Sequence, residues 1–89
     1  MESTSQPEIT VYSNPGCQPC LATKRQLDKL GLAYGEASAA DSPQMVNLVR
    51  SLGLPEEAPI VVAKRVVDGS QRQEIWTGFR PDRLRSLAA

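Results

Sequence analysis

The sequence predicts an α/β fold in which a four-stranded mixed sheet carries three helices on its two faces. Three observations lead to this class. Short segments rich in β-branched residues alternate with segments of helical periodicity, which is typical of β-α-β units. Two cysteines, Cys17 and Cys20, lie at the first strand-to-helix junction. A turn signal at Asp68-Gly69-Ser70 predicts a hairpin near the end, which gives the order β-α-β-α-β-β-α.

The first half of the chain is expected to form one β-α-β unit. Segment 9–12 is a short strand, and the chain from Gln18 to about Leu30 is rich in helix formers and ends at Gly31. Segment 33–37 is expected as the second strand, mainly because its position completes the unit. The side chains at one-face spacing on the helix are Cys20, Thr23, Leu27 and Leu30.

A second helix is expected after Asp41 or Ser42, with Pro43 in its first turn and Gly53 at its end. Residues 54–59 form a loop. Residues 60–63, Ile-Val-Val-Ala, are an uninterrupted apolar run typical of a strand that is covered on both faces. The apolar face of the second helix is expected to contain Met45, Leu48, Val49 and Leu52.

The strand that starts at residue 60 continues to Val67, and the chain returns as a strand over 73–77. Gly78 interrupts this strand. A last helix begins near Pro81, with Leu84 and Leu87 as its apolar contacts.

Residues 8–89 are expected to form a single domain, preceded by a flexible polar tail over residues 1–7. The tail lacks the hydrophobic region of a secretory signal, and the chain has no apolar run of about 20 residues that would span a membrane. We therefore expect a cytoplasmic protein, a setting in which an isolated C-x-x-C motif is usually catalytic. Its size and polar surface suit a monomer.

Charge excludes one class of partner. The formal net charge is zero, with four basic and seven acidic residues through Glu57 and six basic and three acidic residues after it. Neither half has the basic and aromatic pattern of a nucleic-acid-binding surface. The asymmetry fits either an oriented encounter with a protein partner or ordinary solvated faces of mixed sign.

The cysteine pair is the strongest functional signal. Segment 14–20 has the sequence Asn-Pro-Gly-Cys-Gln-Pro-Cys. A thiol in the first turn of a helix faces unpaired backbone N–H groups and the positive end of the helix dipole, both of which favour the thiolate. We therefore expect Cys17 to be the nucleophile and Cys20, on the buried face, to resolve a mixed disulfide. Pro19 suits a first turn, where its missing N–H has no helical partner.

Three other roles fit the cysteine pair less well. A structural disulfide that closes a four-residue loop would add only about 2 kcal/mol in loop entropy. A structural zinc site needs four ligands, and the chain has no His and no third Cys. Inert buried thiols do not fit the turn-forming residues 14–16. We therefore predict no metal and no bound cofactor, only a redox-active disulfide between Cys17 and Cys20.

The element order, with a dithiol between the first strand and the first helix, is that of the thioredoxin fold. Three motifs resemble the NrdH-redoxins, which are small proteins with a glutaredoxin-like sequence and thioredoxin-like behaviour. These motifs are Cys17-Gln18-Pro19-Cys20, residues 58–62 (APIVV) and residues 76–84 (WTGFRPDRL). The similarity extends from about residue 9 to residue 87, and the third motif discriminates best.

The resemblance implies a thiol–disulfide oxidoreductase that donates electrons to class Ib ribonucleotide reductase and is itself reduced by thioredoxin reductase with NADPH. It implies that Cys17 attacks, that Cys20 resolves, and that Pro59 is a cis-proline facing the dithiol. The backbone at Ala58 would then be free to pair with an extended segment of the partner. A trans proline at the start of a strand is the alternative.

The same resemblance suggests which residues contact a partner. In the last motif the alternative is structural: the two aromatic side chains pack the last helix on the sheet, and the two charged residues hold its first turn. The expected partner-binding positions are Pro15, Gln18, Pro19, Ala58, Pro59, Trp76, Thr77, Gly78, Phe79, Arg80 and Asp82.

The sequence departs from the family at two places. Many relatives have a lysine near the position of Asn14, so here a thiolate at Cys17 depends more on backbone donors and the helix end. The stretch from Lys64 to Arg72 is long for the family, which leaves the hairpin register open.

Two other functions compete with this interpretation. A glutathione-dependent glutaredoxin usually has a Gly-Gly pair and acidic residues after the fourth strand, where this chain has Thr77-Gly78-Phe79-Arg80. A redox-sensing binding module would use the dithiol to switch a surface instead of passing electrons onward.

Overall fold

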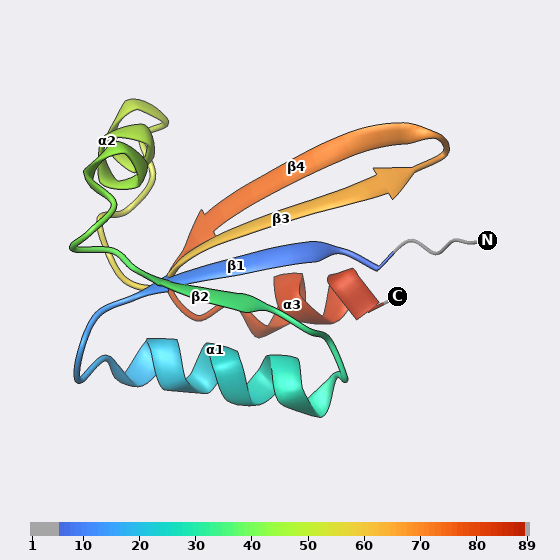
Figure 1. The fold of residues 1–89 in the computed structure, drawn as a ribbon, viewed down its shortest axis with the longest axis horizontal. Helices are drawn as coiled ribbons and strands as arrows, with labels where there is room; N and C mark the ends of the chain where they lie inside the picture. Colours follow the sequence, from blue (N-terminus) through green and yellow to red (C-terminus); the bar gives the residue numbers. More distant parts are fainter. Residues whose placement is uncertain (1–5, 89) are drawn as a thin grey trace.

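A central sheet with the strand order β2-β1-β3-β4 organises the molecule. The computed structural model describes residues 6–88, so most of the tail expected over residues 1–7 lies outside the described residues. Helices α1 and α3 cover one face of the sheet and α2 lies on the other (Figure 1). The elements are β1 (Glu8–Ser13), α1 (Gln18–Lys29), β2 (Gly35–Ser38), α2 (Pro43–Ser51), β3 (Ile60–Val67), β4 (Ser70–Thr77) and α3 (Pro81–Ala88).

The strand pairing confirms the predicted mixed sheet. β1 and β2 are parallel, as the β-α-β unit requires. β3 is antiparallel to β1 and to β4, and its register with β4 runs without a bulge from the pair Ile60–Thr77 to the pair Val67–Ser70. The hairpin register, which the sequence left open, is therefore regular along its whole length.

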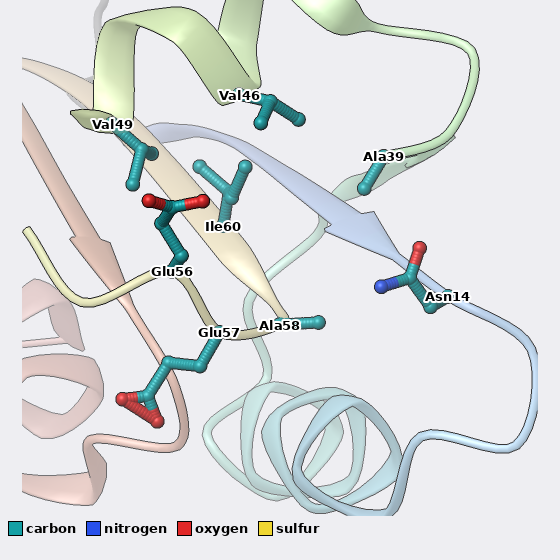
Figure 2. A pocket seen from close by; sticks show the side chains of 8 residues that line it. All are labelled: Asn14, Ala39, Val46, Val49, Glu56, Glu57, Ala58 and Ile60. Atoms are coloured by element: carbon teal, nitrogen blue, oxygen red, sulfur yellow. The ribbon is translucent and has the colours of Figure 1, made fainter. Parts of the chain in front are cut away.

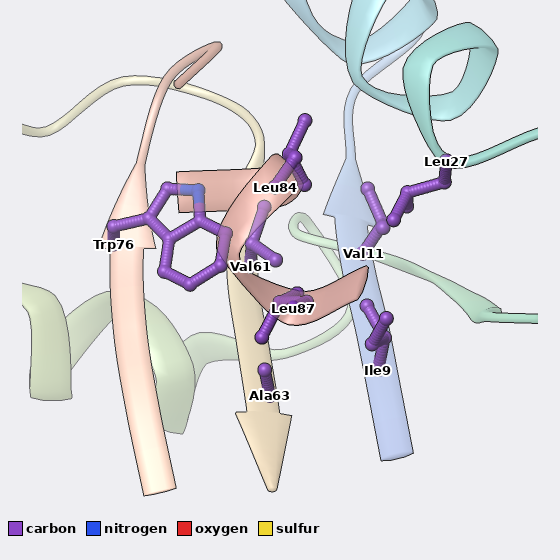
Figure 3. Packing of buried hydrophobic residues seen from close by; sticks show 8 residues of the cluster. All are labelled: Ile9, Val11, Leu27, Val61, Ala63, Trp76, Leu84 and Leu87. Atoms are coloured by element: carbon purple, nitrogen blue, oxygen red, sulfur yellow. The ribbon is translucent and has the colours of Figure 1, made fainter. Parts of the chain in front are cut away.

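The first four residues of β3 are buried on both faces of the sheet, as their apolar run predicts. Val61 and Ala63 belong to the larger core beneath α1 and α3, whereas Ile60 and Val62 belong to a smaller core beneath α2. The alternation follows from the two-residue side-chain period of a strand. The larger core consists of Ile9, Val11, Leu27, Val61, Ala63, Trp76, Leu84 and Leu87 (Figure 3).

Helix α1 has the predicted buried face. Cys20, Thr23 and Leu27 are buried, and Leu30 packs against the same core from the end of the helix. This core side of α1 holds the cysteine motif against the end of the sheet.

The contact face of α2 differs from the prediction. Val49 is buried and Met45 packs against the smaller core as expected, but Leu48 and Leu52 are 37% and 52% exposed. Val46 packs against this core instead. The face of α2 that meets the sheet is therefore turned toward Val46, a rotation that sequence spacing alone does not specify.

Two boundaries also differ from the prediction. β2 begins at Gly35 and reaches Ser38, because the residues that pair with β1 are those opposite Thr10 to Ser13. β4 begins at Ser70, so Asp68 and Gly69 alone form the turn, with φ of 52° and 79°. Two consecutive residues with positive φ are typical of a two-residue hairpin turn that matches the twist of the strands.

Tyr34 is a half-buried side chain that packs against the larger core near the amino end of β2. Burial raises the pKa of its hydroxyl above the ordinary value of 10.0, and the negative charges of Asp28 and Glu36 raise it further, while Lys24 opposes them. Lys24 is itself ion-paired with Glu36 at 3.0 Å.

We therefore expect alkaline pH to weaken the fold through Tyr34. The unfolded chain loses this proton first, so stability that is present below pH 10.0 is lost as the pH rises toward the higher folded pKa. The difference in tyrosinate absorbance between the native protein and Tyr34→Phe should have a midpoint above 10.0. A midpoint at or below this value would contradict the assignment.

The end of β4 is tied to the loop before β3. The N–H of Gly78 donates to the carbonyl oxygen of Pro59 at 2.9 Å, and Gly78 has φ of +81°, a conformation that favours glycine. A Cβ atom at this position would lie 2.9 Å from Oε1 of Glu57. The glycine therefore leaves space for a carboxylate against the backbone at this end of the sheet.

Gly78→Ala should destabilise the protein more than Gly53→Ala. Both glycines have positive φ, but nothing lies within 4 Å of a Cβ at Gly53. Each change carries the backbone cost of about 1–2 kcal/mol for an L-residue in this region, and only Gly78→Ala must also shift the flexible end of the Glu57 side chain, which adds a small further cost. Urea denaturation of both variants, alone and with Glu57→Ala, isolates that contact. Equal costs in all backgrounds would contradict it.

Candidate active site

The cysteine pair lies where β1 gives way to α1. Cys17 is the N-cap of α1, with an extended backbone conformation, and Gly16 before it has φ of +68°. Cys17 and Cys20 form a disulfide, and their Cα atoms are 5.2 Å apart. Cys17 is half-buried, whereas Cys20 is only 2% exposed. Cys17 is therefore the more exposed of the two residues, as the helical spacing predicts.

The backbone of the first turn provides one hydrogen-bond donor to the sulfur of Cys17. The N–H of Cys20 donates to Sγ of Cys17 at 3.1 Å, and the carbonyl of Cys17 accepts from the N–H of Leu21 at 3.2 Å. The first turn of α1 contains no acidic residue. A negative sulfur at the N-cap would thus meet an N–H donor and the positive helix end, with no carboxylate from the same turn beside it.

The sequence left two conformations open for the peptide bond before Pro59, cis and trans. The peptide bond between Ala58 and Pro59 is cis, as predicted. Pro59 is buried and Ala58 half-buried, and the carbonyl of Pro59 is occupied by the N–H of Gly78.

A cavity of about 180 Å³ lies between the active-site loop and α2 (Figure 2). Asn14 and Ala58 line it at the end nearest the cysteine motif, Val46 lines it from α2, and Glu57 from the loop before β3. Val46 and Glu57 were not predicted as site residues from the sequence. Neither belongs to a motif, and only the crossing of loop and helix brings them to one cavity.

The other expected partner-binding positions separate into surface and core. Around the cysteines, Pro15, Gln18 and Pro19 are exposed. In the last motif, Trp76 is buried in the larger core beneath the guanidinium of Arg83, which lies 4.7 Å from its ring centroid.

The rest of the last motif surrounds the turn from β4 to α3. Thr77 and Gly78 are buried, while Phe79 is 39% exposed. Nε of Arg80 donates to the carbonyl of Thr77 at 3.2 Å, and Asp82 is exposed in the first turn of α3. The structure therefore places both a structural contact and an exposed aromatic side chain within this motif.

The described residues contain neither a cluster of metal-binding side chains nor a helix that could span a membrane. Within residues 6–88, no group of three or more His, Cys, Asp or Glu side chains is arranged to hold a metal ion. Among the helices of the same residues, none combines the length and apolar character that a membrane span requires.

Comparison with known proteins agrees with this geometry. Residues 9–67 match the glutaredoxin family. The glutaredoxin-like protein NrdH of Escherichia coli (strain K12) is 29% identical over 79 residues, which cover 89% of this chain and 86% of that protein.

Two solved structures are similar in fold. The NrdH-redoxin of Escherichia coli, described as a glutaredoxin-like protein with a thioredoxin-like activity profile, has a TM-score of 0.69 and 29% identity, covering 90% of this chain and 93% of the other. A variant of the thioredoxin-like protein BC3987 has a TM-score of 0.62 and 29% identity, covering 92% and 100%. The fold is therefore the thioredoxin fold, and the chain belongs to the glutaredoxin family of thiol–disulfide oxidoreductases, within which it is similar to the NrdH-redoxins.

Proposed function

We propose that the protein passes electrons from thioredoxin reductase to class Ib ribonucleotide reductase, with Cys17 as the attacking thiol and Cys20 as the resolving thiol. The observation that carries the assignment of roles is the difference in exposure between the two cysteine residues: Cys17 is half-buried at the helix cap and Cys20 is 2% exposed. A disulfide of another protein meets the more exposed cysteine first.

The reaction requires two exchanges. The thiolate of Cys17 attacks one sulfur of the target disulfide, forms a mixed disulfide and releases the other target sulfur, which takes up a proton. Cys20 then loses its proton and attacks Sγ of Cys17, which releases the second target thiol. The target gains two electrons and two protons, and the protein is left with the Cys17–Cys20 disulfide.

The surroundings of the dithiol support a protein disulfide as the target. Pro15, Gln18 and Pro19 are exposed beside Cys17, and the cavity bounded by Asn14 and Ala58 opens next to this loop. An extended segment of a partner could pair with the backbone at Ala58 and bring its cysteine to Cys17. The remaining expected partner contacts, from Trp76 to Asp82, would act partly through packing and partly through the exposed ring of Phe79.

The identity of both partners rests on similarity to NrdH proteins. We also propose that the protein works in the reducing cytoplasm. It would act as a monomer that presents its dithiol to each partner in turn. No metal or bound cofactor has a role in it.

Glutathione is a less suitable electron donor. The end of β4 carries one glycine, and the carboxylate of Glu57 lies against it. Where a glutathione-dependent glutaredoxin usually has a second glycine followed by acidic residues, this chain continues with the bulky Phe79 and the cation Arg80.

The donor is tested by comparing two coupled assays on an insulin-type disulfide. We expect NADPH oxidation with thioredoxin reductase to proceed at least about tenfold faster than with glutathione and glutathione reductase, which would correspond to about 1.4 kcal/mol in transition-state stabilisation. The same assays on Cys17→Ser measure the background. Faster turnover with glutathione would reverse the assignment, and no turnover with either donor would favour a redox sensor.

The roles of the two thiols are tested by trapping. Cys20→Ser should accumulate a mixed disulfide on Cys17, because the resolving thiol is missing, and Cys17→Ser should accumulate far less because Cys20 is buried. Non-reducing electrophoresis followed by peptide mass analysis identifies the linked cysteine. Faster alkylation of Cys20 than of Cys17 in the reduced protein would reverse the roles.

A further inference from the structure

Thr23 is a buried polar side chain on the core face of α1. It is 0% exposed, and Oγ1 donates a hydrogen bond to the carbonyl oxygen of Pro19 at 2.8 Å. In a regular helix this carbonyl also accepts from the N–H of the residue four positions later, which is Thr23 itself. The hydroxyl is therefore a second donor to a carbonyl inside the cysteine motif.

The carbonyl of Pro19 and the N–H of Cys20 belong to the same peptide group. That N–H donates to Sγ of Cys17 at 3.1 Å. Three groups are thus connected in series: the hydroxyl of Thr23, the peptide between Pro19 and Cys20, and the sulfur of Cys17. The donated proton at the oxygen end polarises the peptide and makes its N–H a stronger donor at the other end.

Pro19 makes this one N–H especially important. The side chain of an N-cap residue accepts from the N–H of the second or the third helical residue. In α1 the second residue is Pro19, which has no N–H, so the third residue, Cys20, provides the only such donor.

We propose that Thr23 is a positioning residue that stabilises the Cys17 thiolate through the peptide between Pro19 and Cys20. The inference rests on the proposed role of Cys17 as the nucleophile. Thr23 does not touch the target disulfide; it acts on the sulfur of Cys17 from the core side of the helix.

The simpler interpretation is that the hydroxyl only satisfies its own hydrogen bond in an apolar environment. The two interpretations differ in what they predict for Thr23→Val. Valine has nearly the same shape as threonine and lacks the hydroxyl, and the carbonyl of Pro19 retains the helical N–H as a partner. A purely structural hydroxyl can change the stability of α1 but leaves the sulfur of Cys17 unaffected.

The test is an ultraviolet titration of the thiolate in reduced protein that carries Cys20→Ala. This background has a single thiol and retains the N–H of residue 20. Cooperative strengthening of about 10–30% in a charge-assisted hydrogen bond predicts that Thr23→Val raises the titration midpoint of Cys17 by about 0.2–0.6 of a pH unit. Thr23→Ser, which retains the hydroxyl, should leave the midpoint within error of the parent.

Ser51→Ala is the matched control. Oγ of Ser51 donates to a helical carbonyl, that of Leu48 at 2.9 Å, far along the chain from the dithiol. It should leave the midpoint unchanged. Circular dichroism confirms folding, and Thr23→Ala replaces Thr23→Val with the same expected shift if the valine variant is unfolded.

Three results would overturn the proposal: no shift in either variant without the hydroxyl, an equal shift in Thr23→Ser, or an equal shift in Ser51→Ala. The titration needs no partner enzyme. If the electron-donor assays show no turnover, the titration can therefore still be interpreted. If the titration shows no shift, the assignment of the electron donor is unaffected.

Discussion

The hydrogen bond from the N–H of Cys20 to Sγ of Cys17 is the interaction on which the active site depends. It exists because β1 ends beside the amino end of α1, so that the first cysteine becomes a helix cap and the second the third helical residue. The dipole and the unpaired N–H groups of a helix act only within its first turn. Moving the motif by one residue in either direction would remove a sulfur from this environment.

The remainder of the fold holds that helix end in place. Leu27, on the same face of α1 as Cys20, packs with Val11 of β1 and Val61 of β3 in the larger core. On the opposite side of the sheet, α2 and the loop before β3 enclose the cavity beside the cysteine loop. The two faces of β3 therefore have different tasks: one anchors the catalytic helix, and the other forms the wall of the surface that a partner would meet.

The sequence was sufficient for the element order, the mixed sheet and the placement of the cysteines. Cys17 and Cys20 differ in exposure as the helical period predicts, and the run from Ile60 to Ala63 is buried on both faces as its composition predicts. The rotation of α2 was not predictable, because Val46 and Leu48 are both apolar and sequence spacing does not show which of them meets the sheet. Glu57 was missed for a related reason: its place against Gly78 depends on two loops that are distant in sequence.

The hairpin of β3 and β4 extends well away from the cysteines. Its last pairs, from Arg65–Arg72 to Val67–Ser70, have no neighbour in β1, and its tip lies at the end of the sheet opposite to the start of α1 (Figure 1). Exposed hairpin tips tolerate inserted sequence better than core segments do. The turn at Asp68 and Gly69 thus provides a natural point for attaching a dye, a surface tether or a fused domain, while the sulfur chemistry proceeds undisturbed at the far end of the molecule.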